Sequence, residues 1–490
     1  MSALKQLSEW VADAPSEWSE SSNKIAIEAF VDTAACMIAG SVNQSTCAVE
    51  RSVADNSGMA TAVTGGGPYP ATFAALINGT AAHALDFDDV LEGANTHASA
   101  VLVPALLALG SERASPGTAC IDAYLVGIEV MACIGRSLDL THYTRGWHAT
   151  STIGTVAAAA ACARLLALPP TVAGDAISLA VSMSSGTKAQ FGTAAKPFHA
   201  GMAAMNGILA AKLAEAGLEA GDNILDGPWG LNSLYGGNQE KSIGGEVGSL
   251  GADTAHVLMG IRQKAYPCCF SNHQAIVGAT RLRKTHKLTS ATIAKVDVEL
   301  PTIYSDNLVF RNPSTIREAQ FCLEYCLSAA LINGGVSVDD FTDSAIASPE
   351  KRALMSKIHR VPIIEGVSDT SVESAMDVTV KIFTHDGDCF TECVSLPPTL
   401  KDAELREKFL SCSEAFLPTA KAWEIYKKIN GMVEVKDIVE LNSLLSLGSS
   451  FKCNTQSPLG IGCCDGHTKQ APLRLKFQMQ HSEPFGHRML

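Results

Sequence analysis

The sequence predicts a mainly α-helical protein with a large all-helical domain and a smaller α+β lid domain. Residues 1 to about 260 place apolar side chains at three- and four-residue spacing, and no regular β alternation occurs there. Alternating segments and a hairpin signal occur after residue 264, and helical spacing resumes near residue 400. The 490 residues exceed what one hydrophobic core usually supports, so two domains are expected.

Helical periodicity in the first half is strong and rich in alanine. The expected helices cover residues 25–38, 71–85, 99–111, 118–136, 153–167 and 197–216. Segment 153–167 is almost entirely alanine and aliphatic, and a helix that is apolar all round is expected to be buried centrally. Pro169 and Pro170 end that helix, and Gly217 ends the one that begins at Pro197.

The middle of the chain shows strand alternation. Residues 295–300 form an expected strand that ends at Pro301. Residues 377–383 and 389–396 are expected to pair as a hairpin around the turn at 385–388. Helices are expected at 272–284, 316–333, 402–410, 419–429 and 435–445.

These patterns divide the chain into three regions. The helical domain is expected to comprise residues 1–263 and 398–447, because the last helices rejoin the helical body. The α+β lid domain, residues 264–397, is then an insertion. Residues 448–490 contain glycine, proline and three cysteines without periodicity, so an irregular tail is expected there.

Composition excludes several classes of partner. The formal net charge is −13 and no basic stripe is present, which argues against nucleic acid and an anionic membrane surface. No segment reaches about 18 uninterrupted apolar residues, the length of a membrane span. The 15 cysteines are scattered, which favours buried reduced thiols in a cytoplasmic protein over a disulfide framework. A mitochondrial location stays compatible with these features, and the cysteine spacings favour no metal site.

Two polar islands interrupt the apolar background. The first, residues 83–97, contains two histidines together with Asp86, Asp88 and Asp89. The second, residues 196–199, reads Lys-Pro-Phe-His. Charged groups near a core are costly unless they are paired or used. The two islands therefore predict one acid–base pocket assembled from distant segments.

Three basic side chains, His97, His148 and Lys196, each stand at the start of an apolar helix. A helix N-terminus carries free N–H groups and partial positive charge, so it binds carboxylates and disfavours protonation of a histidine. A neutral imidazole there can accept a proton from carbon. Structural alternatives stay open: Lys196 at the cap of its helix could pair a surface acid, and Asp89 could cap a helix.

The segment 264–273 lies where the pattern changes from helical spacing to strand alternation, and it contains Tyr266, Cys268, Cys269 and His273. A joint between domains is a common position for a ligand cleft. Cys269 as a nucleophile would need an adjacent base, and the sequence shows none beside it. This segment is therefore expected to contribute to binding.

Taken together, these motifs resemble the signature of the MmgE/PrpD family. The resemblance covers residues 1 to about 447 and lies in Ala74-Ala75-Leu-Ile-Asn78-Gly79, His83-Ala-Leu85-Asp86-Phe87-Asp88-Asp89, Gly127-Ile-Glu129, Trp147-His148, Gly154-Thr155, Lys196-Pro197, His199-Ala-Gly201 and Tyr266-Pro267-Cys268-Cys269. It implies a homodimer with a large helical domain and a smaller α+β lid, which works without metal or organic cofactor. It also implies an active site between the two domains that holds Asp86, His97, His148 and Lys196.

The resemblance also implies a reaction class. The family includes cis-aconitate decarboxylase, 2-methylcitrate dehydratase and iminodisuccinate epimerase, which all handle a proton and negative charge beside carboxylates. The expected function is a cis-aconitate decarboxylase-like lyase that acts on an aconitate or an alkyl-substituted tricarboxylate, and the Cys268-Cys269 pair favours it over a 2-methylcitrate dehydratase. An epimerase is a further alternative. Val90 and Cys269 depart from the animal decarboxylases, which have threonine and histidine there, and these departures motivate an inactive helical scaffold as the last alternative.

Each expected site residue has a role in this scheme. His97 and His148 transfer protons, Lys196 binds a substrate carboxylate, and Asp86 orients the site. The expected substrate-binding residues are Lys196, His199, Tyr266, Cys269, His273 and Tyr304, the last of which lies near an active-site tyrosine of the family.

Overall fold

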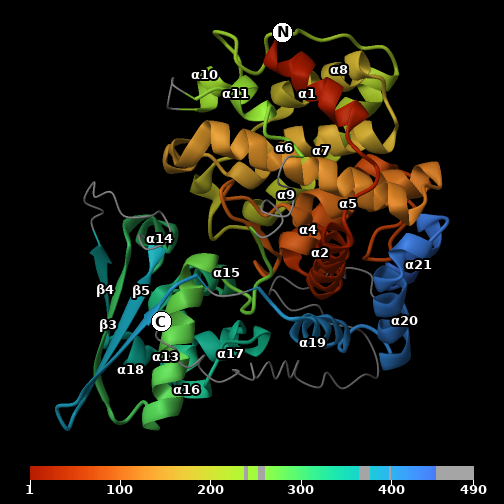
Figure 1. Ribbon diagram of the computed structural model, residues 1–490. Coiled ribbons are helices and arrows are strands. Elements are labelled where there is room, and N and C mark those ends of the chain that lie inside the picture. The colour runs from red at the N-terminus through yellow and green to blue at the C-terminus, as the bar shows by residue number, and fades with distance from the viewer. Residues whose placement is uncertain (237–240, 252–259, 364–375, 397–398, 449–490) are drawn as a thin grey trace, which may run out of the picture.

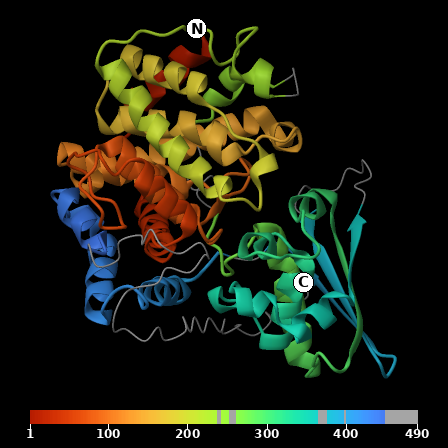
Figure 2. The same cartoon turned by 180° about the vertical axis from the view of Figure 1, so that it is seen from behind.

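The computed structural model describes residues 1–236, 241–251, 260–363, 376–396 and 399–448 (Figure 1). Helices form most of the structure and a small sheet lies at one end, so the fold is mainly α with a small α+β part. Figure 2 shows from behind that the helices around residues 402–445 lie beside the N-terminal helices and not on the sheet. The expected tail lies outside the described residues, except for Gly448.

The helical part is formed by two stretches of chain. The first comprises α1 (Ala3–Asp13), α2 (Glu20–Gly40), α3 (Gln44–Ser52), α4 (Ala71–His83), α5 (Ser99–Arg113), α6 (Gly117–Thr144), α7 (Ala149–Leu165), α8 (Pro170–Met183), α9 (Ala195–Glu215), α10 (Leu231–Tyr235) and α11 (Ile243–Val247). The second comprises α19 (Asp402–Ser413), α20 (Thr419–Asn430) and α21 (Ile438–Leu445). Because α19 and α20 pack on α2, the last helices return to the first ones.

Small residues bring the central helices close together. α4, α5 and α7 are buried along most of their length, because apolar residues cover every face. At the crossing of α4 and α9, a methyl group on Gly201 would lie 2.2 Å from the Leu76 carbonyl oxygen. A methyl group on Gly79 would lie 2.8 Å from Gly201 Cα. These two glycines therefore permit backbone contact between the helix that leads into the first polar island and the helix that carries the second.

α6 is long and apolar enough to cross a membrane by composition alone. It has 28 residues with a mean hydropathy of 1.6 in its apolar window, but 83% of that window is buried inside the protein. The helix is interrupted at Asp139, where φ is 46°. Its burial marks α6 as a core helix.

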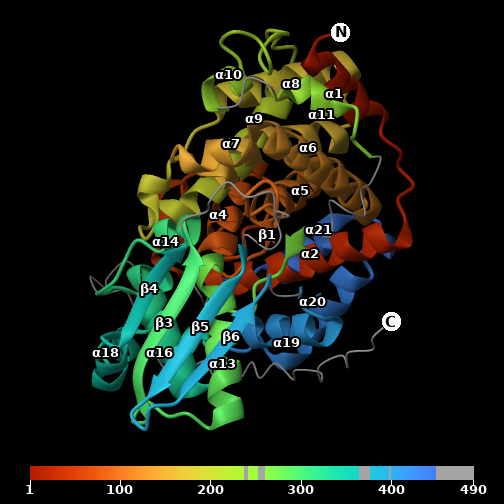
Figure 3. The ribbon, with the colours of Figure 1, turned by 60° about the vertical axis from the view of Figure 1, so that its left-hand side comes forward.

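The smaller part contains a four-stranded sheet in the order β4-β3-β5-β6 (Figure 3). β3 (Ile293–Pro301) pairs parallel with β4 (Ile358–Ile363) and antiparallel with β5 (Val378–Thr384), which forms a hairpin with β6 (Cys389–Val394). α13 (His273–His286) packs on β5 and β6, and α16 (Leu323–Asn333) packs on α13. Short helices complete this part: α14 (Thr302–Asn307), α15 (Ile316–Gln320), α17 (Asp343–Ile346) and α18 (Pro349–Met355).

Buried apolar side chains form two hydrophobic clusters. The larger one draws on residues 4–261 and resumes over residues 400–447. The smaller one draws on residues 266–394 and on Phe191 from the helical part. The chain passes from the first cluster to the second within residues 262–265, which lie beside the first polar island.

Three sequence expectations are wrong in detail. The first half is not purely helical, because β1 (Val90–Leu91) pairs with β2 (Ile261–Arg262) in a ribbon too short to show alternation. α9 begins at Ala195, so Lys196 lies inside its first turn and not at the cap. The segment 316–333 forms two helices because the backbone is extended at Cys322, whose sulfur accepts a hydrogen bond from the Tyr325 N–H.

Periodicity also missed some elements. α8 begins at Pro170, where proline is favoured as a first helical residue, although this proline was expected only to end the preceding helix. β4 escaped notice because Pro362 interrupts it, which an edge strand tolerates. Among the described cysteines eleven are free and nine of these are buried, as expected for thiols outside a disulfide framework, whereas Cys47 is disulfide-bonded.

We expect Gly201→Ala to lower the free energy of unfolding by about 1–3 kcal/mol, because the added methyl group must push α4 away from α9. Gly248→Ala is the control, since its methyl group meets open space and the residue has helical φ and ψ. Thermal unfolding followed by circular dichroism measures both variants. Equal unfolding temperatures would contradict the proposed close contact.

Candidate active site

The Asp86 carboxylate is the centre of a buried ionic cluster. Its Oδ1 atom accepts hydrogen bonds from Lys196 Nζ at 2.8 Å and from Lys264 Nζ at 2.9 Å. Lys264 also donates to the Asp86 carbonyl oxygen at 2.9 Å. Burial alone would raise the pKa of Asp86, but the two ammonium groups hold it well below its usual value. Burial likewise disfavours the charge on Lys264, yet Asp86 keeps the pKa of that lysine raised.

A second carboxylate, Asp88, contacts two histidines. Nδ1 of His83 lies 3.0 and 2.9 Å from its two oxygens, and Nδ1 of His97 lies 3.1 Å from Oδ2. His97 also faces the first carboxylate, with Nε2 3.7 Å from Asp86 Oδ1. The His83 and His97 rings are 4.3 Å apart. His97 therefore lies between both aspartates.

His148 and His199 form an adjoining pair. Their Nδ1 atoms are 2.9 Å apart, so one ring donates and the other accepts, and the two neutral rings have opposite tautomers. The His148 ring lies 5.9 Å from His83 and 5.1 Å from Phe191. The Nε2 atoms of His148 and His83 and the Oδ2 atom of Asp86 are buried and have no hydrogen-bond partner among the described residues. Such atoms are uncommon in folded proteins and are expected where a ligand or water binds.

Burial keeps the site histidines neutral at pH 7. It lowers the pKa of His97 to about 3 and that of His199 to about 4. The pKa of His148 is held well below its usual value by burial and by the neighbouring Lys196 ammonium. A neutral imidazole can take up a proton, but it must first be protonated before it can act as a strong acid.

Distant segments supply these side chains. Asp86 and Asp88 lie in the turn between α4 and β1, and Asp86 has the left-handed φ of 50°. His97 precedes α5, and His148 is the residue before the first turn of α7. Lys196 and His199 come from the start of α9. The expectation that three basic side chains stand at helix starts is therefore confirmed.

Two segments join the smaller part to the Asp86 cluster: the chain after β2 and the end of α15. Lys264 follows β2, and the pairing of Val90 with Arg262 brings that segment alongside the loop that contains Asp86. The Gln320 side chain donates to the carbonyl oxygens of Leu85 at 2.7 Å and Pro267 at 3.2 Å. The break between α15 and α16 thus places a polar side chain where the two parts meet.

Five of the expected site residues lie in this cluster: Asp86, His97, His148, Lys196 and His199. Each is linked to another cluster residue by a contact of 5.9 Å or less. Lys196 does not pair a surface acid, because its partner is the buried Asp86. Asp89 has the structural role that was left open, since it accepts a hydrogen bond from the Ser99 N–H at the start of α5.

Of the other expected residues, Tyr266, Cys269 and Tyr304 lie in the smaller hydrophobic cluster, and His273 is the first residue of α13. Burial, with the nearby Asp86 charge, raises the pKa of the Cys269 thiol to about 11, so this residue is a neutral thiol. The rings of Tyr266 and His273 are 5.1 Å apart. Tyr304 is buried on α14. Within the described part of the chain, no hydrogen bond joins Tyr266, His273 or Tyr304 to the cluster around Asp86.

Lys264 was not expected in the site, and His83 and Asp88 were expected there only as members of the first polar island. Lys264 opens the segment that contains Tyr266, and a lysine at the junction of two parts was a usable signal. His83 and Asp88 were part of the first polar island, but their spacing of five residues does not reveal that they bond each other.

Four of these side chains could also hold a metal ion by geometry. One ligand atom from each of His83, Asp86, Asp88 and His97 lies within 4.8 Å of the others. However, Lys196 and Lys264 already bond Asp86 and add positive charge, which disfavours a further cation.

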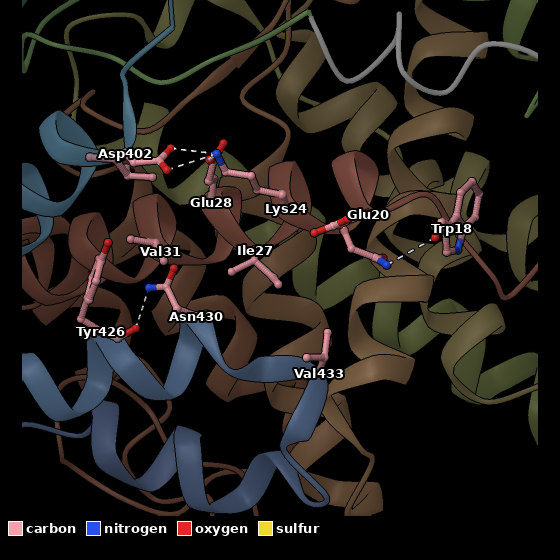
Figure 4. A pocket seen from close by; sticks show the side chains of 12 residues that line it. Trp18, Glu20, Lys24, Ile27, Glu28, Val31, Asp402, Tyr426, Asn430 and Val433 are labelled. Carbon is pink, nitrogen blue, oxygen red and sulfur yellow. Dashed lines mark hydrogen bonds and ion pairs between the residues drawn. The ribbon is translucent and has the colours of Figure 1, made fainter.

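A surface groove of about 450 Å³ lies elsewhere, between α2, α19 and α20 (Figure 4). Its charged lining residues are Glu20, Lys24, Glu28 and Asp402, and Lys24 bonds Asp402 at 3.0 Å. Three acids and one base give the groove negative charge, which opposes a carboxylate ligand. It shares no lining residue with the Asp86 cluster, so the groove is not our candidate for the substrate site.

The chain thus combines a helical part and a small α+β part with a buried cluster of lysine, aspartate and histidine. Residues 5–243 match the MmgE/PrpD N-terminal domain, and residues 266–430 match the MmgE/PrpD C-terminal domain. The chain belongs to the MmgE/PrpD family, as its sequence motifs indicated.

Curated relatives of this chain include cis-aconitate decarboxylases. It is 30% identical to the cis-aconitate decarboxylase of Homo sapiens over 413 residues, which cover 79% of this chain and 82% of the relative. It is 28% identical to that of Mus musculus over 396 residues, with 77% and 78% covered. The identity to that of Aspergillus terreus is 27% over 412 residues, with 79% and 82% covered.

We expect acid to destabilise the fold well before most carboxylates are protonated. Burial lowers the pKa of four histidines: His97 and His273 to about 3, and His142 and His199 to about 4. Histidine in an unfolded chain titrates near about 6.5, so between pH 7 and 4 the unfolded state binds protons that the folded state excludes. The stability that these histidines contribute is therefore fully present above pH 7 and is lost as the pH falls below 7. Asp89 acts in the opposite sense, because burial raises its pKa to about 7.

Unfolding temperatures measured at constant ionic strength from pH 7.5 to 4.5 check this expectation. His142→Asn, which lies outside the cluster, should make the pH dependence shallower by removing one titrating group. An unfolding temperature that stays constant over this range would contradict the burial of neutral histidines.

Proposed function

We propose that this protein is a carboxy-lyase that decarboxylates cis-aconitate or an alkyl-substituted analogue. The observation that carries the proposal is the grouping of two lysines and two neutral histidines, Lys196, Lys264, His97 and His148, around the buried Asp86. The relatives named cis-aconitate decarboxylase support the same reaction, because the similarity covers both parts of the chain.

The two lysines would bind the substrate. Lys196 and Lys264 are held by one carboxylate, Asp86, which orients both ammonium groups, and the ionised Asp86 and Asp88 together balance the charge of the two lysines. In a buried site such fixed charges act more strongly on an anion than they would in water. The lysines can therefore attract a tricarboxylate locally, although the chain carries a net charge of −13.

Decarboxylation would proceed with a shift of the double bond. The bond between the saturated carbon of cis-aconitate and its carboxylate breaks, and this electron pair forms the new double bond as carbon dioxide leaves. The original double-bond pair moves to the far alkene carbon and spreads into the carboxylate attached there. Lys196 and Lys264 would stabilise that charge. The far carbon then takes one proton, so the step consumes one proton and releases one carbon dioxide.

A histidine would supply that proton. His97 and His148 are neutral without substrate, but a bound polyanion raises the pKa of a neighbouring imidazole and allows it to bind a proton from solvent. Asp88 would stabilise a protonated His97, since it lies 3.1 Å from Nδ1. The other ring nitrogen of His97 faces Asp86, the carboxylate that binds both lysines, which makes His97 our first candidate for the donor.

A 2-methylcitrate dehydratase is the second candidate. Its reaction begins when a base removes a proton from carbon, and the neutral pair of His148 and His199 favours such a step. The same lysines would hold the carboxylates of a citrate.

Incubation of the purified protein with cis-aconitate is expected to release carbon dioxide and yield an unsaturated dicarboxylate. Gas release and proton NMR measure this directly. Under the alternative, 2-methylcitrate gives an ultraviolet-absorbing alkene without gas. No turnover of any citrate or aconitate relative, alkyl-substituted analogues included, would reject both functions and favour an inactive scaffold.

Lys196→Ala is expected to raise KM and to lower kcat by at least tenfold, because the variant loses a cation that binds substrate and stabilises the developing charge. Lys212→Ala is a matched control on the same helix, where Lys212 pairs with Glu112 at the surface. Steady-state kinetics on both variants test the assignment. Wild-type constants for Lys196→Ala would remove this residue from the site.

A further inference from the structure

A buried lysine outside the proposed catalytic set supports the Asp86 cluster from the adjacent core. Lys408 on α19 is fully buried, and its Nζ donates to the carbonyl oxygens of Phe87 at 2.7 Å and Lys264 at 2.9 Å. The same atom lies 2.6 Å from Oδ1 of Asp32 on α2. It also lies 3.9 Å from the centroid of the Phe87 ring. One ammonium group thus joins three segments of the chain.

The two carbonyl groups belong to the residues that arrange the cluster. Phe87 follows Asp86, whose left-handed φ of 50° is a strained conformation for a residue other than glycine. Lys264 is the residue whose ammonium group binds Asp86. Lys408 therefore fixes the backbone on both sides of the Asp86–Lys264 ion pair.

We propose that Lys408 and Asp32 form a buried clamp that positions Asp86 and Lys264 for the reaction. Its effect on turnover rests on the proposed function, whereas its effect on the backbone does not. Neither Lys408 nor Asp32 contacts a side chain that we propose to bind substrate, so both are positioning residues. The clamp lies beside the joint between the two parts, because Lys408 and Phe87 line one small void together with Val336 of the smaller part.

A purely structural role for the Lys408–Asp32 pair predicts a loss of stability alone, whereas a positioning role also predicts a lower kcat. Removing one member of a buried ion pair is strongly destabilising, because the other charge is left alone. Removing both charges avoids that cost. The double variant Asp32→Asn/Lys408→Met would therefore recover most of the stability lost in Lys408→Met, but it would still lack the donor to the Phe87 and Lys264 carbonyls.

A second buried pair provides the matched control. Lys351 Nζ lies 2.7 Å from Asp340 Oδ1 within the smaller part, and both side chains are buried. Neither residue belongs to the Asp86 cluster. The control variant Asp340→Asn/Lys351→Met loses the same kind of ion pair without loss of the donor to the site backbone.

The experiment combines thermal unfolding, steady-state kinetics and hydrogen exchange by mass spectrometry. For Asp32→Asn/Lys408→Met we expect kcat to fall at least tenfold, and exchange to become faster in residues 84–91 and 260–267. The control pair should retain kcat and wild-type exchange in those segments. If Lys408→Met does not fold, the double variant carries the test.

A double variant with wild-type kcat and wild-type exchange at residues 84–91 would overturn the clamp. If the wild-type protein turns over no aconitate or citrate, the proposed function fails, but the exchange measurement still decides whether the clamp holds the Asp86 loop. Faster exchange confined to the two segments supports it in that case, and unchanged exchange rejects it.

Discussion

The ion pair that Asp86 shares with two lysines is the interaction on which the rest of this site depends. A buried charge is tolerated only when it is paired and hydrogen-bonded, so Asp86 forces Lys196 and Lys264 to meet it away from water. The same low-dielectric surroundings keep the histidines neutral and strengthen each remaining electrostatic contact. The anion binding and the proton transfer that we propose would therefore have one physical origin.

The helical packing explains why these groups can meet. Gly79 and Gly201 let α4 and α9 approach to backbone contact, and the ends of these two helices deliver Asp86 and Lys196 to one point. The β1–β2 ribbon then brings Lys264 alongside the loop that contains Asp86, and Gln320 bonds that loop from the smaller part. The cluster is enclosed as a result. The side chain of His97, which lies between both aspartates, is only 12% exposed.

Much of this arrangement could be predicted from the sequence, and the remainder has identifiable causes. Helical periodicity located the central helices, and alternation with a turn signal located the β5–β6 hairpin, because both patterns are local. The polar islands identified Asp86, His97 and Lys196, since charges in an apolar region require partners. Lys264 was left out because its partner is 178 residues away, and Lys408 was left out because a lysine on an amphipathic helix normally points to solvent.

The position of Lys408 near the end of the chain has a consequence for protein synthesis. Phe87 and Lys408 are 321 residues apart, so the ribosome completes the Asp86 loop long before it makes the lysine that fixes this loop. Under the proposed clamp, the strained turn after α4 gains the contact from Lys408 only once α19 has docked on α2. The proposed clamp is therefore the last contact that the loop containing Asp86 can gain during synthesis, after Lys196 and Lys264 have already been made.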